Sequence, residues 1–276
     1  MNKELCIIHA NCQADPMLEL LLRHPVFCRR FVVEKYTNYR REKIDPARLA
    51  ACDVFMYQHL GDKWGEHAST HLLNLVNPKA LALRLPNMLF KGYWPFWTNR
   101  SPSDFGDSFL DRLLDMGLGK REILHLYLHS DITNKFDLTA MFEESIAIER
   151  DKEKGCVASY VDLMLHHFRQ EQLFGTINHP RPRLLWHMTQ GVLAALDLPA
   201  LPGADSQAYA QFADPYAEFA LPIHPQVAAF HNLAFAGANT RYEVFGKQKT
   251  FAEYTNNYID CRLHGLASFV GYLQVA

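Results

Sequence analysis

The fold is decided by the stretch Ile7-Ile8-His9-Ala10-Asn11-Cys12-Gln13-Ala14-Asp15-Pro16. An apolar run that begins at Leu5 ends here in small and polar residues, and leucines at helical spacing follow it. This order predicts a strand, a tight turn and a helix, with Asp15 as the N-cap and Pro16 as the first helical residue. The turn between strand and helix therefore carries a cysteine.

Two interpretations of Cys12 stay open at this point. A thiol beside the positive end of a helix dipole is favoured as thiolate, which is the nucleophilic form. Backbone N–H groups near Cys12 and Gln13, aided by Asn11 and Gln58, would then stabilise a tetrahedral oxyanion. The alternative is a small buried side chain with no chemical role, as in many proteins.

Composition narrows the class of protein. The chain has 276 residues, of which 49% are hydrophobic and 21% are charged, so a substantial core is expected. A formal net charge of −2 gives no support for nucleic-acid binding. The six cysteines form no C-x-x-C pair, and we expect no metal site. Cys6 and Cys52 are expected to be buried thiols in a reducing compartment.

The sequence also shows no targeting or membrane signal. Only four apolar residues follow Lys3 and Glu4, which is too short for a secretory signal. No window approaches 18 uninterrupted apolar residues. We therefore expect a cytoplasmic protein without a membrane span.

Strands alternate with helices in the first part of the chain. Strands are predicted at 31–36, 53–58 and 80–85, and helices at 45–51 and 66–76. This pattern predicts an α/β fold with a parallel sheet flanked by helices. Ligands of such sheets collect at the carboxyl ends of the strands, which here carry Asn11-Cys12-Gln13, Gln58-His59 and Arg84-Leu85-Pro86-Asn87.

The remainder of the chain is predicted to be mostly helical. We divide the chain into an α/β part, 1–103, and a mainly helical part, 104–276, which packs on the first and contributes site residues. An aromatic loop over 88–103 lies before the boundary, and it is either a wall of the site or a small core of its own. Helices are predicted at 104–116, 120–129, 137–154, 156–171, 182–196, 225–235 and 251–266.

A cysteine nucleophile needs a base, usually a histidine. His179 is the preferred candidate because it lies in an irregular piece between predicted helices, and His9 and His59 near strand ends are alternatives. His125 and His129 have the i, i+4 spacing of metal ligands but no third ligand at a typical spacing.

Several motifs together resemble the WcbI-like family of bacterial polysaccharide biosynthesis proteins. They are the Asn11-Cys12-Gln13 turn, the strand Asp53–Gln58 ending in glutamine, the segment from Arg84-Leu85-Pro86-Asn87 to Gly92-Tyr93-Trp94-Pro95, and Asn178-His179-Pro180. The resemblance covers the first hundred residues well and the rest loosely. It implies a coenzyme A-binding acyltransferase with a sheet related to the SGNH/GDSL esterases, in which Cys12 replaces the usual serine.

Two positions depart from the family pattern. Ala10 stands where the family usually has glycine, and alanine tolerates a positive φ poorly. The turn therefore either does not need that conformation or is altered. Thr176 occupies the acidic position of the esterase-like Asp-x-x-His, so a Cys12–His179 dyad would act without a third member.

The resemblance implies transfer of an acetyl group from acetyl-coenzyme A to a sugar hydroxyl in a capsule or surface polysaccharide. Arg84 and Lys91 are expected to bind coenzyme phosphates, with Asn87 beside them and with Tyr93 or Trp94 against the adenine or pantetheine. The alternatives are an esterase or deacetylase with a cysteine nucleophile and a non-catalytic protein that binds sugar or coenzyme A. A homo-oligomer is possible.

Overall fold

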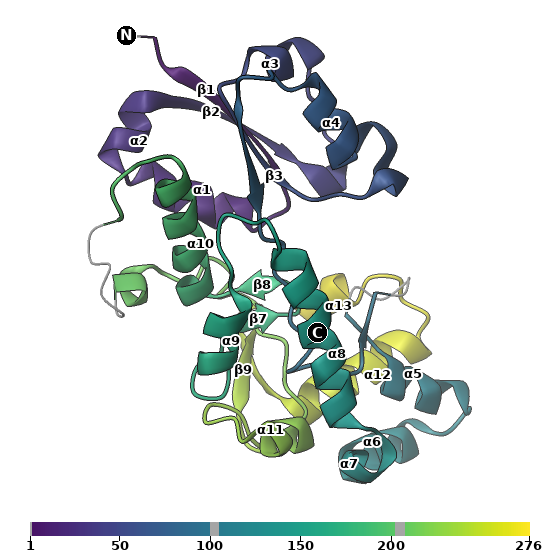
Figure 1. The fold of residues 1–276 in the computed structure, drawn as a ribbon. Coiled ribbons are helices and arrows are strands. Elements are labelled where there is room, and N and C mark those ends of the chain that lie inside the picture. The colour runs from purple at the N-terminus through teal and green to yellow at the C-terminus, as the bar shows by residue number, and fades with distance from the viewer. Residues whose placement is uncertain (1, 100–104, 202–207) are drawn as a thin grey trace. The chain divides into compact units, whose positions relative to one another are not determined.

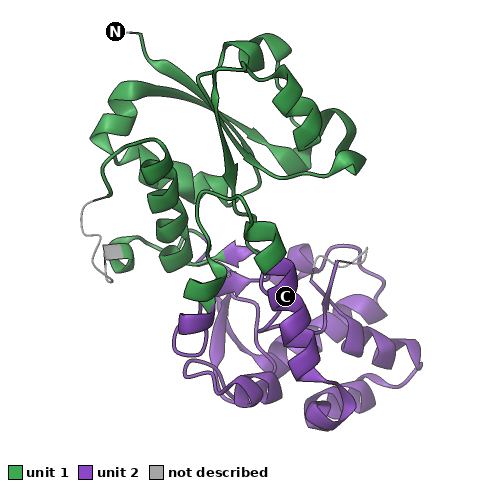
Figure 2. Ribbon diagram, in the orientation of Figure 1, with its two compact units in different colours: residues 1–88, 150–164, 180–215 green, residues 89–149, 165–179, 216–276 purple. Residues whose placement is uncertain are grey.

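The computed structural model describes residues 2–99, 105–201 and 208–276. The chain forms two compact units, each built from three separate segments (Figure 2). Unit 1 contains 1–88, 150–164 and 180–215, and unit 2 contains 89–149, 165–179 and 216–276. Composition divides the chain once, at 103/104, whereas the contacts within the folded chain group segments that lie far apart in the sequence.

Unit 1 is built on a four-stranded parallel sheet with the order β2-β1-β3-β4. The central strand β1 pairs with β2 from Glu4↔Phe31 to Ala10↔Thr37 and with β3 from Cys6↔Val54 to His9↔Tyr57. Residues 5–10 of β1 are all buried, as expected for a strand covered on both faces. The strands are β1 (Glu4–Ala10), β2 (Phe31–Thr37), β3 (Val54–Gln58) and β4 (Leu81–Leu85).

Helices cover both faces of this sheet (Figure 1). On one face, Leu49 of α3 and Leu72 of α4 pack with Leu5, Ile7 and Phe55 in a buried cluster. The other face is covered by α1, α2 and α10. The predicted parallel sheet flanked by helices is thus confirmed, while its relation to the SGNH esterases stays a prediction. The helices are α1 (Ala14–Leu22), α2 (Pro25–Arg30), α3 (Pro46–Ala51), α4 (Ser69–Leu75) and α10 (Pro182–Ala195), with short 3-10 turns η1 (Asn38–Arg40), η2 (Asp62–His67) and η3 (Ala208–Gln211).

The start of α1 differs from the prediction. The helix begins at Ala14 after Gln13, and the predicted N-cap Asp15 lies inside it, where it pairs with Lys35 instead. The helix starts early because the turn already has helical geometry: the Ala14 N–H donates to the Asn11 carbonyl at 3.1 Å. The helix predicted over 45–51 is confirmed as α3, and Asp45 caps it by accepting the Ala47 N–H at 2.9 Å.

Unit 2 combines helices with short two-stranded sheets. Its helices are α5 (Ser108–Asp115), α6 (Lys120–His129), α7 (Ile132–Lys135), most of α8 (Leu138–Glu153), the end of α9 (Val161–His167), α11 (Pro225–His231), α12 (Phe251–Leu263) and α13 (Phe269–Val275). The strand pairs are β5 (Trp97–Thr98) with β6 (Gly106–Asp107), β7 (Phe174–Thr176) with β8 (His179–Pro180), and β9 (Arg241–Val244) with β10 (Lys247–Thr250).

Three predictions for this part of the chain were wrong. The helix predicted over 156–171 is restricted to α9. The one predicted over 251–266 ends at Leu263 as α12, and the separate helix α13 that follows it was not predicted. The hairpin β9–β10 was missed, although Phe245 and Gly246 form its turn with φ values of 50° and 80°. Two successive positive φ values are what a tight hairpin turn requires. Residue 104, the predicted start of the first helix here, lies outside the described residues.

In the described ranges, no helix has the length and apolar character needed to cross a membrane.

Three buried histidines share one electrostatic feature. Burial lowers the pKa of His9 to about 4, with a further contribution from the neighbouring His67 ring and a partial offset from Glu42. Burial likewise lowers the pKa of His224 and His231 to about 4. The folded chain thus resists protonation of these rings over a range in which an unfolded chain accepts protons.

We predict that His9 makes the protein less stable as the pH falls. The unfolded chain binds a proton on this ring near pH 6.5, whereas the folded chain binds it only near pH 4. The contribution of neutral His9 to the free energy of unfolding is therefore complete above pH 6.5. It is lost progressively as the pH falls to 4, by up to about 3 kcal/mol. Urea unfolding at several pH values should show a shallower loss for His9→Gln than for the parent. His166→Gln, at an exposed site, serves as the control, and equal slopes for parent and His9→Gln would contradict the prediction.

Candidate functional site

The carboxyl ends of three strands in unit 1 meet through side-chain amides. Asn11 follows β1, Gln58 ends β3 and Asn87 lies shortly after β4. The Asn11 Nδ2 donates to Asn87 Oδ1 at 3.1 Å, and the Asn11 backbone N–H donates to Gln58 Oε1 at 2.8 Å. The predicted convergence of polar residues at this edge is present for these three side chains.

Both the nitrogen and the oxygen of the Gln58 side-chain amide form hydrogen bonds within unit 1. Its side chain is buried, and its Nε2 donates to the Pro86 carbonyl at 3.0 Å. Its Oε1 accepts the Asn11 N–H and, at 3.5 Å, the Nδ2 of Asn38. Gln58 therefore connects the end of β1 to the segment that leaves β4.

Gln13 makes a matching two-point contact with the same segment. Its Nε2 donates to the Met88 carbonyl at 2.7 Å, and its Oε1 accepts the Met88 N–H at 3.1 Å. Both residues are fully buried. The backbone N–H of Gln13 is also bonded, to Asn11 Oδ1 at 2.9 Å. We call these contacts of Asn11, Gln13 and Gln58 the amide clamp.

The amide clamp occupies the groups to which the sequence assigned oxyanion stabilisation. The N–H of Gln13, the side chain of Asn11 and the side chain of Gln58 all bond within unit 1. A donor already bonded to a buried acceptor stabilises a developing oxyanion only after that bond breaks. We therefore interpret these residues as positioning residues, which hold the turn around Cys12.

Cys12 differs from the buried cysteines of the chain in its accessibility. Its side chain is half-buried, whereas Cys6, Cys52 and Cys261 are buried. Burial raises the pKa of the Cys6 thiol to about 12, with a further contribution from Cys52, which makes Cys6 chemically inert. The expectation that Cys6 and Cys52 are buried thiols is confirmed. Cys12 sits in the turn that the clamp fixes, directly before α1.

Ala10 resolves the first departure from the family pattern. It is the last residue of β1, fully buried and paired with Thr37, and its φ is not positive. The turn therefore needs no glycine at this position.

Arg84 lies in β4 beside Tyr57 of β3 and is partly buried. Its Nη2 donates to the Lys152 carbonyl at 3.2 Å. Its Nε is buried and, within the described residues, lacks a hydrogen-bond partner. One buried donor of the guanidinium, the Nε, is therefore unused within the described residues.

The predicted base His179 lies in β8 and belongs to unit 2, whereas Cys12 belongs to unit 1. The His179 ring stacks on Tyr216 with centroids 4.2 Å apart and planes 8° from parallel. Thr176 is fully buried, and its hydroxyl contacts Asn178 Oδ1 at 3.4 Å. Threonine at this position supplies no carboxylate to orient the imidazole.

Tyr93 and Trp94 are packed inside unit 2. Tyr93 is fully buried, and its hydroxyl donates to the Phe168 carbonyl at 2.7 Å. The Trp94 Nε1 lies 3.2 Å and 3.1 Å from the carbonyls of Leu221 and Pro222. Burial leaves the Tyr93 ring no exposed face, so we assign it to packing instead of coenzyme stacking. Lys91 is partly buried, with its Nζ 5.5 Å from the centre of the Trp97 ring.

The comparisons with known proteins agree with this architecture. The family model described as polysaccharide biosynthesis enzyme WcbI matches residues 5–201. The chain belongs to the WcbI family. A solved WcbI structure, described as a novel polysaccharide biosynthesis enzyme, has a TM-score of 0.77 and 19% identity, and the match covers 99% of this chain and 94% of that one.

At 19% identity, the likeness to the solved WcbI structure shows a shared fold. That structure is described as the native protein without a disulfide bond between coenzyme A and one of its cysteines. No curated protein matches the chain at a significant level. The family description makes the chain a member of a family of enzymes in polysaccharide biosynthesis.

The sequence did not predict two parts of this candidate site. Asn38 is buried just after β2 and reaches Gln58, and its position after a strand end was the available signal. The Gln13 side-chain amide donates to the backbone carbonyl of Met88, which lies 75 residues further along the sequence, and no local pattern predicts such a contact. Among the described residues, no group of three or more His, Cys, Asp or Glu side chains is arranged to hold a metal.

We predict that Gln13→Met destabilises the protein by about 2–6 kcal/mol. The substitution keeps the side-chain length but leaves the buried N–H and carbonyl of Met88 without partners, at about 1–3 kcal/mol for each group. Urea unfolding measures the loss. Gln170→Met, at an exposed position, is the matched control, and an equally small effect of both variants would contradict the clamp.

Proposed function

We propose that the chain transfers an acyl group, most simply acetyl, from a coenzyme A thioester to a sugar hydroxyl in the biosynthesis of a capsule or surface polysaccharide. The observation that carries the proposal is the amide clamp, which fixes a turn with one half-buried thiol at the carboxyl edge of a parallel sheet. Membership of the WcbI family and the coenzyme A named for the similar structure support the donor and the pathway class.

The proposed reaction has two steps. The Cys12 thiolate attacks the thioester carbonyl, a bond forms between its sulfur and the acyl carbon, and the coenzyme thiolate leaves. The proton released from Cys12 passes through the base to that leaving thiolate. A sugar hydroxyl then attacks the acyl carbon and loses its proton to the base, and the bond between that carbon and the Cys12 sulfur breaks. The base returns the proton to the sulfur, so that the sugar ester is released and the thiol is restored.

The proposed base is His179. Its ring is partly buried and is held flat against Tyr216, which limits its rotation. A histidine accepts a thiol or hydroxyl proton near neutral pH, as each step requires. With threonine at position 176, we propose a dyad of Cys12 and His179, because a thiol needs less activation than a serine hydroxyl.

For the coenzyme phosphates we propose Arg84 and Lys91, with Asn87 near the reacting end. Arg84 is only partly buried, and a guanidinium suits phosphate oxygens. Asn87 is already bonded to Asn11, so it would approach the donor beside the turn.

The decisive experiment incubates the protein with acetyl-coenzyme A and identifies acetylated peptides by mass spectrometry. We expect one acetyl group on Cys12 in the parent and none at this position in Cys12→Ala. The rate at which free coenzyme A is released should be at least about 100-fold lower in Cys12→Ala than in the parent. Cys28→Ser, which alters another half-buried thiol of unit 1, should behave as the parent.

Equal rates in Cys12→Ala and the parent would contradict a covalent role for this thiol. Acetate release from an acetylated sugar without coenzyme A would instead identify the esterase alternative. Tight binding of coenzyme A or sugar without turnover would identify a non-catalytic binding protein.

A further inference from the structure

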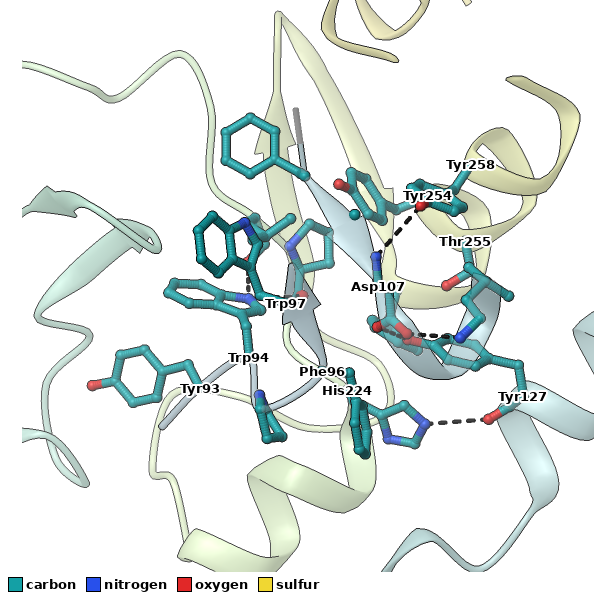
Figure 3. A pocket seen from close by; sticks show the side chains of 17 residues that line it. Tyr93, Trp94, Phe96, Trp97, Asp107, Tyr127, His224, Tyr254, Thr255 and Tyr258 are labelled. Carbon is teal, nitrogen blue, oxygen red and sulfur yellow. Dashed lines mark hydrogen bonds between the residues drawn. The ribbon is translucent and has the colours of Figure 1, made fainter. Parts of the chain in front are cut away.

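A small cavity lies within unit 2, and none of the residues of the proposed reaction lines it. It has a volume of about 50 Å³ and is lined mainly by aromatic side chains, with Asp107, His224 and Thr255 as polar members (Figure 3). Two strands, β5 and β6, contribute Trp97 and Asp107, and α12 contributes Tyr254.

Two polar groups on its wall are buried and unused. In the part of the chain that the structure describes, the Tyr254 hydroxyl and the Trp97 Nε1 have no hydrogen-bond partner. Tyr254 is only 7% exposed, and burial raises its pKa well above the usual value, so its hydroxyl stays a donor. A buried donor without a partner costs about 1–3 kcal/mol, which points to an acceptor that fills the cavity.

Of the neighbouring polar groups, His224 uses both ring nitrogens and Asp107 has one position left. The His224 Nδ1 accepts the Gln226 N–H at 3.1 Å, and its Nε2 lies 3.3 Å from the Tyr127 carbonyl. Asp107 Oδ1 accepts the N–H groups of Phe109 and Leu110 at 3.0 and 2.8 Å, whereas Oδ2 accepts the Tyr127 hydroxyl at 2.6 Å. Each carboxylate oxygen accepts two bonds, so Oδ2 retains one position.

The charge and size of the cavity restrict its occupant. A buried carboxylate repels phosphate and other anions, which excludes the phosphate end of coenzyme A. A volume of about 50 Å³ holds a few water molecules or one edge of a small molecule, and it is too small for an adenine ring.

We propose that this cavity binds the hydroxyl edge of a neutral sugar. Aromatic rings would cover the C–H face, the Tyr254 hydroxyl and Trp97 Nε1 would donate to sugar oxygens, and Asp107 Oδ2 would accept a sugar hydroxyl. The ligand that matches this volume is a hydroxymethyl group or a vicinal diol at the end of a glycan. The inference does not depend on the acyl-transfer proposal, because sugar binding here requires neither Cys12 nor coenzyme A.

The test titrates the full chain with methyl glucoside, methyl galactoside and glycerol, and follows binding by saturation-transfer NMR and tryptophan fluorescence. We expect saturable binding of a glycoside, with a Kd about threefold to tenfold higher in Tyr254→Phe and in Trp97→Phe, since each substitution removes one donor. Tyr39→Phe, at a 52% exposed tyrosine, should leave the Kd unchanged.

Thermal unfolding without ligand checks that the variants fold. Tyr254→Phe should have an unchanged or higher Tm, because it removes a buried hydroxyl that has no partner. Saturable binding that weakens in both variants supports the proposal, and its persistence in Cys12→Ala separates it from the acyl-transfer proposal. Two results would overturn the proposal. One is the absence of binding, in which case the cavity holds only water, and the other is an equal Kd in all variants.

Discussion

The structure of the site depends on the two-point contact between the Gln13 amide and the backbone of Met88, together with the bonds of Gln58 to Asn11 and Pro86. Where a parallel sheet ends, backbone groups lose the partners that neighbouring strands provide, and buried groups need replacements. Side-chain amides supply both a donor and an acceptor, so one glutamine satisfies two such groups. The turn after β1 is held by these bonds, and its conformation does not require glycine.

Because of these hydrogen bonds, the three residues of the Asn-Cys-Gln motif have different roles. The residues on either side of the cysteine are committed to structure, with Asn11 bonded to Asn87 and to the Gln13 N–H, and Gln13 bonded to Met88. Cys12 is the half-buried member between them. Substituting the flanking amides would therefore alter the placement of the thiol without removing a reacting group. In unit 2, packed aromatic side chains enclose the small cavity, together with the two buried donors that have no partner among the described residues.

Local patterns in the sequence were sufficient for the sheet and insufficient for the site. Apolar runs predicted β1 to β4 within one or two residues, and Asp45-Pro46 predicted the start of α3. The Asp15 cap was wrong because Asn11 and Cys12 already accept the first helical N–H bonds. The hairpin at 241–250 was missed because its turn uses Phe245 in a left-handed conformation that the sequence does not indicate. The sequence suggested Tyr93 as a ligand contact. Its burial could not be predicted because it depends on residues near 168, far along the chain.

The most direct test of this account is amide hydrogen exchange, measured by NMR on the folded protein, at Asn11, Gln13 and Met88. Each of these N–H groups is bonded to a side chain of the clamp. The account predicts that they exchange as slowly as the amides of β1, and that Gln58→Met selectively accelerates Asn11. Exchange at the rate of an open loop, or an Asn11 amide unaffected by Gln58→Met, would contradict it.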